Sequence, residues 1–268
     1  MRMEEAALAL SAFMEISPES EAVEGLRQWL FLQKETLEWD GTVTYVSIIN
    51  TLLNGSKNQV EDRRLPVVSL NGTPITLSES ESLIGSYTVN LNSSEASGGA
   101  LTIDRESGVP AWGGVVASYI MPVSKVKSEK TAELSIEKKI YLEEGSGRRK
   151  LKKTDRLKKG DKVSVTLFIE CRKDMEYVAI SDIRAACLQP GDWKNGMTAI
   201  DGVPLSKEVR KDRTSFFIEQ LPAGNYVISY DCNIDRDGEY SLGMATVQSL
   251  YSPIQTAHSA GKMIKIGK

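Results

Sequence analysis

The first part of the chain repeats apolar side chains every three or four positions, which is the period of an amphipathic helix. The pattern predicts a helix from residue 4 up to Ser17-Pro18-Glu19-Ser20, a segment typical of a helix break and a new helix start. It predicts a second helix over 21–34 and a third from Thr42 to a cap at Gly55. Three such helices cannot enclose a core, so we expect the last layers of a larger helical array. The predicted apolar faces comprise Ala6, Leu10, Phe13 and Met14; Val23, Leu26, Trp29 and Leu30; and Tyr45, Ile48, Ile49 and Leu52.

From residue 60 the pattern changes to a period of two, which is typical of strands with one buried face. Residues 65–77 are predicted to form a hairpin that turns at Asn71-Gly72. Further strands are predicted at 85–91, 99–106 and 111–120. Short strands separated by Gly, Asn and Ser predict a small β-sandwich.

A second set of alternating segments follows the polar linker 124–132. Turn signals such as Lys159-Gly160-Asp161 separate them, and their number and spacing fit an immunoglobulin-like sandwich. The predicted strands are 133–144, 161–171, 176–187, 215–221, 225–234 and 239–251.

The expected fold class is therefore α+β and multidomain. Residues 1–56 supply a short α-helical segment, 57–124 a first β-segment and 125–268 a second, immunoglobulin-like β-sandwich, with mainly antiparallel strands in both.

Charge is uneven along the chain, but it does not indicate a nucleic-acid partner. The most basic run, 148–162, holds nine basic and two acidic residues. No aromatic residue interleaves with it, so base stacking is not supported, and we interpret it as a solvated loop between strands.

One segment imitates a calcium-binding loop. Asn233, Asp235, Asp237 and Gly238 fall at the first, third, fifth and sixth positions of that pattern. The twelfth position, which should supply a bidentate glutamate, is Met244. We interpret the segment as a hairpin turn with Gly238 at positive φ and expect no metal or other cofactor.

Catalytic motifs are absent or incomplete. The chain has one histidine, His258, which we place in a loop, and Ser135-x-x-Lys138 matches a nucleophile pattern without its companion motifs. The three cysteines, Cys171, Cys187 and Cys232, form no CxxC pair and are interpreted as buried small hydrophobes. We therefore expect no catalytic residues and no enzyme activity.

No targeting or membrane segment is predicted. The first residues carry acids where a signal peptide would need an apolar core, and no apolar run approaches the ~18 residues of a membrane span. The first residues instead resemble the interior of a helix, so we expect a fragment of a longer protein.

Two long stretches carry a resemblance to a known family. Residues 172–190 and 221–259 resemble the last domain of bacterial α2-macroglobulins, in particular large Bacteroidetes-type members. The family's Arg-Asp-Met-Glu-Tyr-Val stretch is similar to Arg172–Val178, here with Lys173 inserted. Its Leu-Pro-x-Gly-x-Tyr and terminal Tyr-x-Pro motifs match Leu221–Tyr226 and Tyr251–Pro253.

The resemblance extends upstream and implies an organisation. Residues 26–53 are similar to the end of the helical thioester domain, an α/α toroid, and 111–120 to the strand that closes a CUB-like β-domain. The resemblance thus implies that 1–56 are the last helices of a thioester-type domain. It implies that 57–124 are a CUB-like segment and that 125–268 are a macroglobulin-like sandwich.

The resemblance also implies a function. Family members are protease traps: a target endopeptidase cuts a bait region, the molecule changes shape and encloses it, and a Cys–Gln thioester captures it in many members. Bacterial members guard the cell envelope, which implies a periplasmic or cell-surface location. The Cys-x-Glu-Gln motif is missing here, so we expect this chain to contribute contacts with upstream domains of the same polypeptide rather than chemistry.

In bacterial relatives a tyrosine from the last domain covers the thioester, and the resemblance makes Tyr251 the candidate for that contact. A strand followed by Tyr and a proline that cannot continue the ladder favours an exposed loop tip. The alternative is that Tyr251 packs against its own sandwich. For the whole chain, a free-standing β-sandwich adhesion or carbohydrate-binding module stays open as an alternative function.

Overall fold

The structure is a computed structural model of the whole chain, and it divides the chain into two compact units. It describes residues 3–36, 41–54, 66–76, 78–81, 86–92, 99–104, 115, 116, 118, 120–145, 147–152 and 155–267. The N-terminal unit comprises Met1–Arg27 with Gly41–Ala117, and the C-terminal unit comprises Gln28–Asp40 with Ser118–Lys268.

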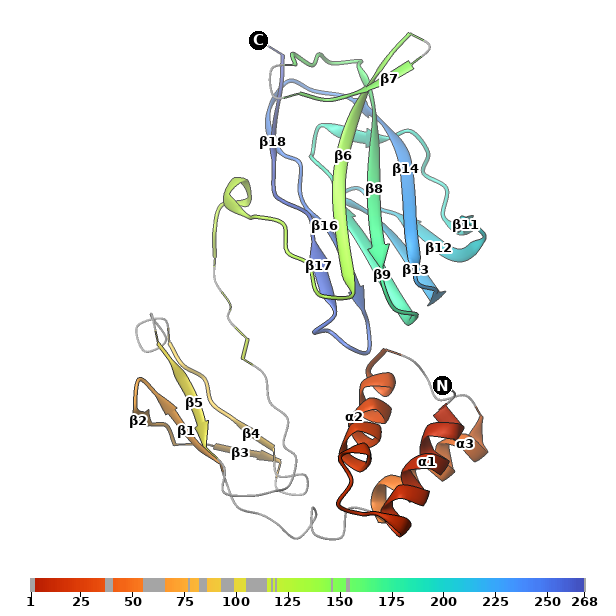
Figure 1. Cartoon of the computed structure of the whole chain (residues 1–268). Coiled ribbons are helices and arrows are strands. Elements are labelled where there is room, and N and C mark those ends of the chain that lie inside the picture. The colour runs from red at the N-terminus through yellow and green to blue at the C-terminus, as the bar shows by residue number, and fades with distance from the viewer. Residues whose placement is uncertain are drawn as a thin grey trace. The chain divides into compact units, whose positions relative to one another are not determined.

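The three predicted helices are confirmed as α1 (Met3–Ile16), α2 (Glu21–Thr36) and α3 (Thr42–Asn54). Helices α1 and α3 contact each other (Figure 1). The Thr44 hydroxyl donates to the Glu4 carboxylate between them. The buried positions include Ala6, Leu10, Ile48 and Leu52 of the predicted faces, whereas Phe13 and Ile49 are exposed. The predicted cap at Gly55 lies outside the described residues.

The first β-segment forms two small sheets. One has the order β2-β1-β5, from β1 (Val67–Leu70), β2 (Thr73–Pro74) and β5 (Leu101–Asp104); the other pairs β3 (Ser78–Glu81) with β4 (Ser86–Thr88). The hairpin at Asn71-Gly72 is confirmed, because both residues have positive φ (52° and 78°), as a tight hairpin turn requires. Of the strand predicted at 111–120, the described residues 115, 116, 118 and 120 are in no strand, and the others lie outside the described part.

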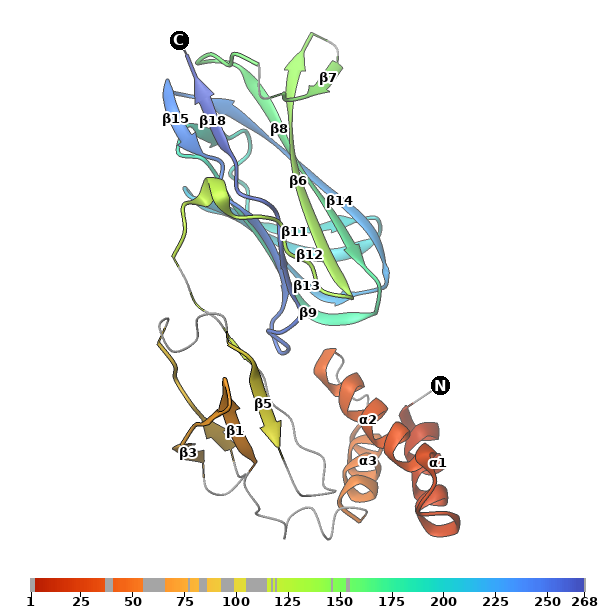
Figure 2. The same cartoon turned by 60° about the vertical axis from the view of Figure 1, so that its left-hand side comes forward.

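Within the C-terminal unit, the strands between Leu134 and Ile266 form an antiparallel β-sandwich, seen as two facing layers in Figures 1 and 2. The five-stranded sheet has the order β10-β14-β8-β6-β7, the six-stranded sheet the order β11-β12-β13-β9-β16-β17, and β15 pairs with β18. Alternate residues of each long strand face inward, as in β6, so the two inner faces share one core. The strands are β6 (Leu134–Glu144), β7 (Gly147–Lys150), β8 (Lys162–Cys171), β9 (Met175–Ile183), β10 (Leu188–Pro190), β11 (Gly196–Ile200), β12 (Val203–Val209), β13 (Arg213–Leu221), β14 (Gly224–Ile234), β15 (Gly238–Ser241), β16 (Ala245–Ser249), β17 (Thr256–His258) and β18 (Met263–Ile266).

The strand predicted over 239–251 is wrong as a single element, because it is two strands in different sheets. Gly243 turns the chain between β15 and β16 with φ 67°. A Cβ on Gly243 would overlap the carbonyl oxygen of Ile183, so the turn needs glycine both for its dihedral angle and for the close approach.

The basic run also differs from the predicted solvated loop. Arg148, Arg149 and Lys150 belong to β7, which pairs with the end of β6. The Arg149 guanidinium forms ion pairs with Glu144 at 2.9 Å and Asp155 at 2.7 Å. Pairing between neighbouring strands and these carboxylates therefore organise the start of the run.

The described helices include none long and apolar enough to cross a membrane.

Candidate functional site

The predicted contact residue Tyr251 lies in the loop between β16 and β17. We call residues Leu250–Ile254 the tip. Tyr251 is 76% exposed, Leu250 50% and Ile254 73%, so three large apolar side chains face outward together. Soluble domains seldom expose such side chains as a group unless they contact something. The exposed loop position of Tyr251 agrees with the prediction.

Backbone hydrogen bonds keep the tip ordered. The Ser249 N–H donates to the Gln255 carbonyl at 3.0 Å, and the Gln255 N–H donates to the Ser252 carbonyl at 2.8 Å. The Thr256 hydroxyl donates to the Pro253 carbonyl at 2.6 Å, and Ser252 itself is buried. The loop thus presents its apolar side chains from a closed hydrogen-bonded turn.

Tyr251 also touches its own sandwich, so both alternatives of the sequence analysis describe part of its environment. Its ring meets the ring of Tyr177 on β9 edge-on, with centroids 5.0 Å apart and planes at 85°. This geometry suits the charge distribution of two aromatic rings. One side of the Tyr251 ring is therefore supported, and most of its surface is available for another partner.

The expectation that His258 is a loop residue is wrong. His258 lies in β17, opposite Thr246, at the end of that strand farther from the tip. Its backbone N–H donates to the Glu129 carbonyl at 2.9 Å, and the Glu129 N–H donates back to the His258 carbonyl at 3.0 Å. The imidazole Nε2 lies 3.4 Å from the Glu129 carboxylate. His258 therefore pairs with Glu129 at the edge of the sheet and does not lie beside Tyr251.

The same pairing shows that the predicted polar linker is attached to the sandwich. We call residues Val123–Thr131 the strap; it begins with a short 3-10 helix, η1 (Val123–Lys125). The Gly261 N–H donates to the Val126 carbonyl at 3.0 Å. A Cβ on Gly261 would overlap the Val123 carbonyl oxygen and would lie 2.8 Å from its carbonyl carbon. The strap therefore covers the β17 edge of the sheet, where unpaired backbone groups would otherwise be exposed.

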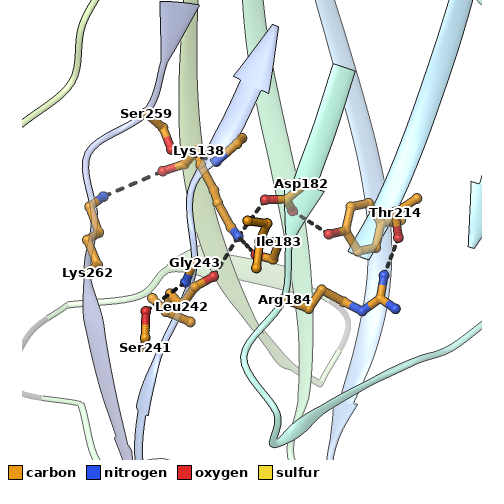
Figure 3. Close-up of polar contacts among 12 residues, drawn as sticks. Lys138, Asp182, Ile183, Arg184, Thr214, Ser241, Leu242, Gly243, Ser259 and Lys262 are labelled. Carbon is orange, nitrogen blue, oxygen red and sulfur yellow. Dashed lines mark hydrogen bonds and ion pairs between the residues drawn. The ribbon is translucent and has the colours of Figure 1, made fainter. Parts of the chain in front are cut away.

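A buried polar cluster lies between the two sheets (Figure 3). The Lys138 Nζ of β6 lies 2.6 Å from an Asp182 carboxylate oxygen of β9, and the two side chains are 5% and 0% exposed. The ammonium also donates to the carbonyls of Ile183 at 2.8 Å and Leu242 at 2.9 Å. The Tyr230 hydroxyl donates to the other Asp182 oxygen.

The cluster is built for structure and not for nucleophilic attack. The Lys138 ammonium donates to two backbone carbonyls and lies against the Asp182 carboxylate, and such contacts stabilise a buried charge. Burial raises the pKa of Asp182 despite its contact with Lys138, and burial and the Asp182 charge raise the pKa of Tyr230. Ser135 of the Ser-x-x-Lys pattern lies three positions earlier on β6, on the opposite face, so the pattern has no shared site.

The calcium-like segment is not the predicted hairpin turn, because β14 and β15 do not pair with each other. Gly238 does have positive φ, at 140°. The Asp235 carboxylate accepts from Arg236 and from the Gln189 amide, and these contacts lower its pKa. Within the ranges that the structure describes, no group of three His, Cys, Asp or Glu side chains gathers as a metal site would require.

The two tryptophans that the structure describes lie in separate segments, so they do not form the aromatic platform that the carbohydrate-binding alternative would need. Trp193 is 48% exposed, and Trp29 on α2 is half-buried. Trp39 and Trp112 lie outside the described residues.

The three free cysteines are buried, and burial raises the pKa of each thiol from its ordinary 9.0: Cys171 and Cys187 to about 11 and Cys232 to about 12. Because the thiolate is the reactive form, we expect a thiol reagent at pH 8 to modify the folded chain ~100-fold more slowly than the urea-unfolded chain. Stopped-flow modification with and without urea measures this effect; equal rates would contradict it.

The raised thiol pKa values also predict a pH dependence of stability. The thiols of the unfolded chain ionise first as pH rises, so the free energy of unfolding should fall between pH 9 and pH 11.

Residues 134–253 match the family model of the bacterial alpha-2-macroglobulin MG10 domain. Among solved structures, the chain is similar to Escherichia coli alpha-2-macroglobulin activated by porcine elastase, with 16% identity and a TM-score of 0.49 over 99% of this chain and 24% of that one. Trypsin-activated E. coli alpha-2-macroglobulin is 17% identical, with a TM-score of 0.49 over 99% and 18%. Salmonella alpha-2-macroglobulin reacted with methylamine is 16% identical, with a TM-score of 0.44 over 99% and 17%. The chain thus spans between 17% and 24% of these proteins. No curated protein sequence matches it.

Proposed function

We propose that the chain is the C-terminal part of a protease trap, because residues 134–253 match the family model of the bacterial alpha-2-macroglobulin MG10 domain. The whole protein would capture endopeptidases, and this part would supply contacts between domains. Elastase and trypsin activate the E. coli relative, which supports peptidases as the targets. A location in the cell envelope belongs to the same proposal.

The observation that carries the proposed contact role is the exposed tip. Leu250, Tyr251 and Ile254 point outward from a hydrogen-bonded turn, and residues 245–257 contain no Asp, Glu, Lys or Arg. Exposing such a surface to water is unfavourable, and burying it against another apolar surface lowers the free energy. We propose that the tip docks on an upstream domain of the same polypeptide and that Tyr251 covers that domain's thioester.

The physical role of such a contact is to exclude water. A thioester hydrolyses in water, and an aromatic side chain over it removes water and amines from the reacting carbonyl. When peptidase cleavage rearranges the trap, the tip would leave and the thioester would become reactive. The Salmonella relative has been captured after reaction with methylamine, so a small amine is a suitable probe of that exposure.

Replacing Tyr251 by alanine in the full-length polypeptide is expected to raise the rate of methylamine incorporation before peptidase addition by ~10-fold to 100-fold. The reason is that a docked aromatic side chain contributes roughly 1.5–3 kcal/mol of apolar burial. Mass spectrometry of the incorporated amine measures the rate.

Tyr141→Ala is the matched control, because Tyr141 lies on the five-stranded sheet, in the end of β6 that pairs with β7, and its ring lies beside Arg148. It should leave the rate unchanged. If Tyr251→Ala also left it unchanged, the tip would not cover the thioester.

A further inference from the structure

The backbone of Tyr177 is unusual for its position. Tyr177 lies inside strand β9, yet its φ is 53°. This is the left-handed region of the backbone, which residues other than glycine and asparagine rarely adopt. The neighbouring residues keep regular pairing, with Val178 opposite Ile218 and Glu176 opposite Gln220. Such a conformation costs free energy and persists only where the surroundings enforce it, often at functional sites.

The unusual backbone points two groups of Tyr177 at the tip. Its carbonyl oxygen accepts the Leu250 N–H at 2.9 Å, one residue beyond the last β9–β16 pair at Ser249 and Val178. Its ring supports the Tyr251 ring edge-on at 5.0 Å. One residue therefore holds both the backbone at the start of the tip and the side chain at its centre. Local irregularities in strands commonly redirect a side chain in this way.

We propose that Tyr177 is the positioning residue of the tip: its left-handed backbone and its ring hold Tyr251 in the orientation that docks on the neighbouring domain. This inference rests on the proposed function. The partner surface must be apolar, since the tip carries no charge, and it must accept an aromatic ring whose one side is already covered by Tyr177. Because the ring is already held in place, docking costs less conformational entropy.

The first test measures the orientation of Tyr251 in the 268-residue chain. With fluorotyrosine incorporated, the ¹⁹F resonance of Tyr251 is assigned as the one that Tyr251→Phe removes. It should be narrow and shifted from the value of an unstructured tyrosine in the wild type and in Tyr177→Phe, which keeps the ring. In Tyr177→Gly and Tyr177→Ala it should move to the value of an unstructured tyrosine. Tyr177→Gly also relieves the backbone, so its urea midpoint should not fall below that of Tyr177→Ala. An unmoved resonance in Tyr177→Gly overturns the positioning role.

The second test measures methylamine incorporation in the full-length polypeptide with the same variants. Losing an edge-on ring pair should raise the rate about two- to tenfold, with Tyr177→Phe near the wild-type rate. If Tyr251→Ala raises the rate and Tyr177→Gly does not, the positioning role fails and the proposed function stands. If neither variant raises it although the ¹⁹F resonance moves, the proposed function fails, and the docking role of Tyr177 fails with it.

Discussion

Lys138→Met is expected to destabilise the C-terminal sandwich by about 3–5 kcal/mol, the usual effect of removing one partner of a buried ion pair. The substitution leaves the Asp182 carboxylate fully buried beside Tyr230, and it leaves the carbonyls of Ile183 and Leu242 without their donor. The measurement is urea-dependent hydrogen exchange of the β8 amides, which reports on the sandwich and not on the helices.

Two comparisons make this result specific to the buried cluster. Lys139→Met removes the next charge along β6, which pairs with Glu137 and lies over the Phe168 ring at a more exposed site, and it should cost ~1 kcal/mol or less. The double variant Lys138→Met with Asp182→Leu removes both buried charges, so it should be less destabilised than the sum of the two single variants. A Lys138→Met protein as stable as Lys139→Met would show that the ion pair contributes little.

Gly261→Ala is expected to detach the strap from the sandwich. The added methyl group would overlap the Val123 carbonyl oxygen, a backbone atom that can yield only if the strap moves. We expect a loss of about 2–3 kcal/mol of stability in the strap contacts, the usual effect of forcing a group into a packed site. The Gly261–Val126 hydrogen bond and the Glu129–His258 pairing would open with it.

Trypsin measures this opening, because the strap carries Lys125, Lys127 and Lys130. Cleavage there should become at least ~10-fold faster, since proteolysis follows the population of the open segment. Gly147→Ala is the matched control: Gly147 has open space around its Cα and no positive φ. Equal cleavage rates in the Gly261 and Gly147 variants would mean that the strap is not held by the close approach at Gly261.

The spacing of apolar residues in the sequence was sufficient to predict the helices and strands that bury a continuous face. The three helices and most of the long strands follow the predicted ranges, because each one keeps its apolar period from end to end. Lys138 and Asp182 also had a readable signal: each falls at an inward position, between Ile136 and Ile140 in one strand and after Ile180 in the other. Their pairing with each other could not be read, because it depends on how the two sheets face.

The missed strands had weaker signals. The β11–β12 hairpin exposes most of β11, so it shows no apolar alternation, although its Asp201-Gly202 turn is a recognisable hairpin pair with positive φ at both residues. Strands β17 and β18 are too short for a period to emerge. The left-handed backbone of Tyr177 has no sequence signal at all, because tyrosine does not favour it.

The contacts of Lys138 also bear on how the sandwich forms during synthesis. The lysine belongs to the first strand of the sandwich, while one of its acceptors, the Leu242 carbonyl, lies 104 residues later. Until that segment emerges from the ribosome, an early collapse would have to bury an ammonium group whose acceptors are incomplete, which is unfavourable. We therefore expect the charge to delay closure of the two sheets until the late strands arrive, and we expect slow folding dominated by distant contacts.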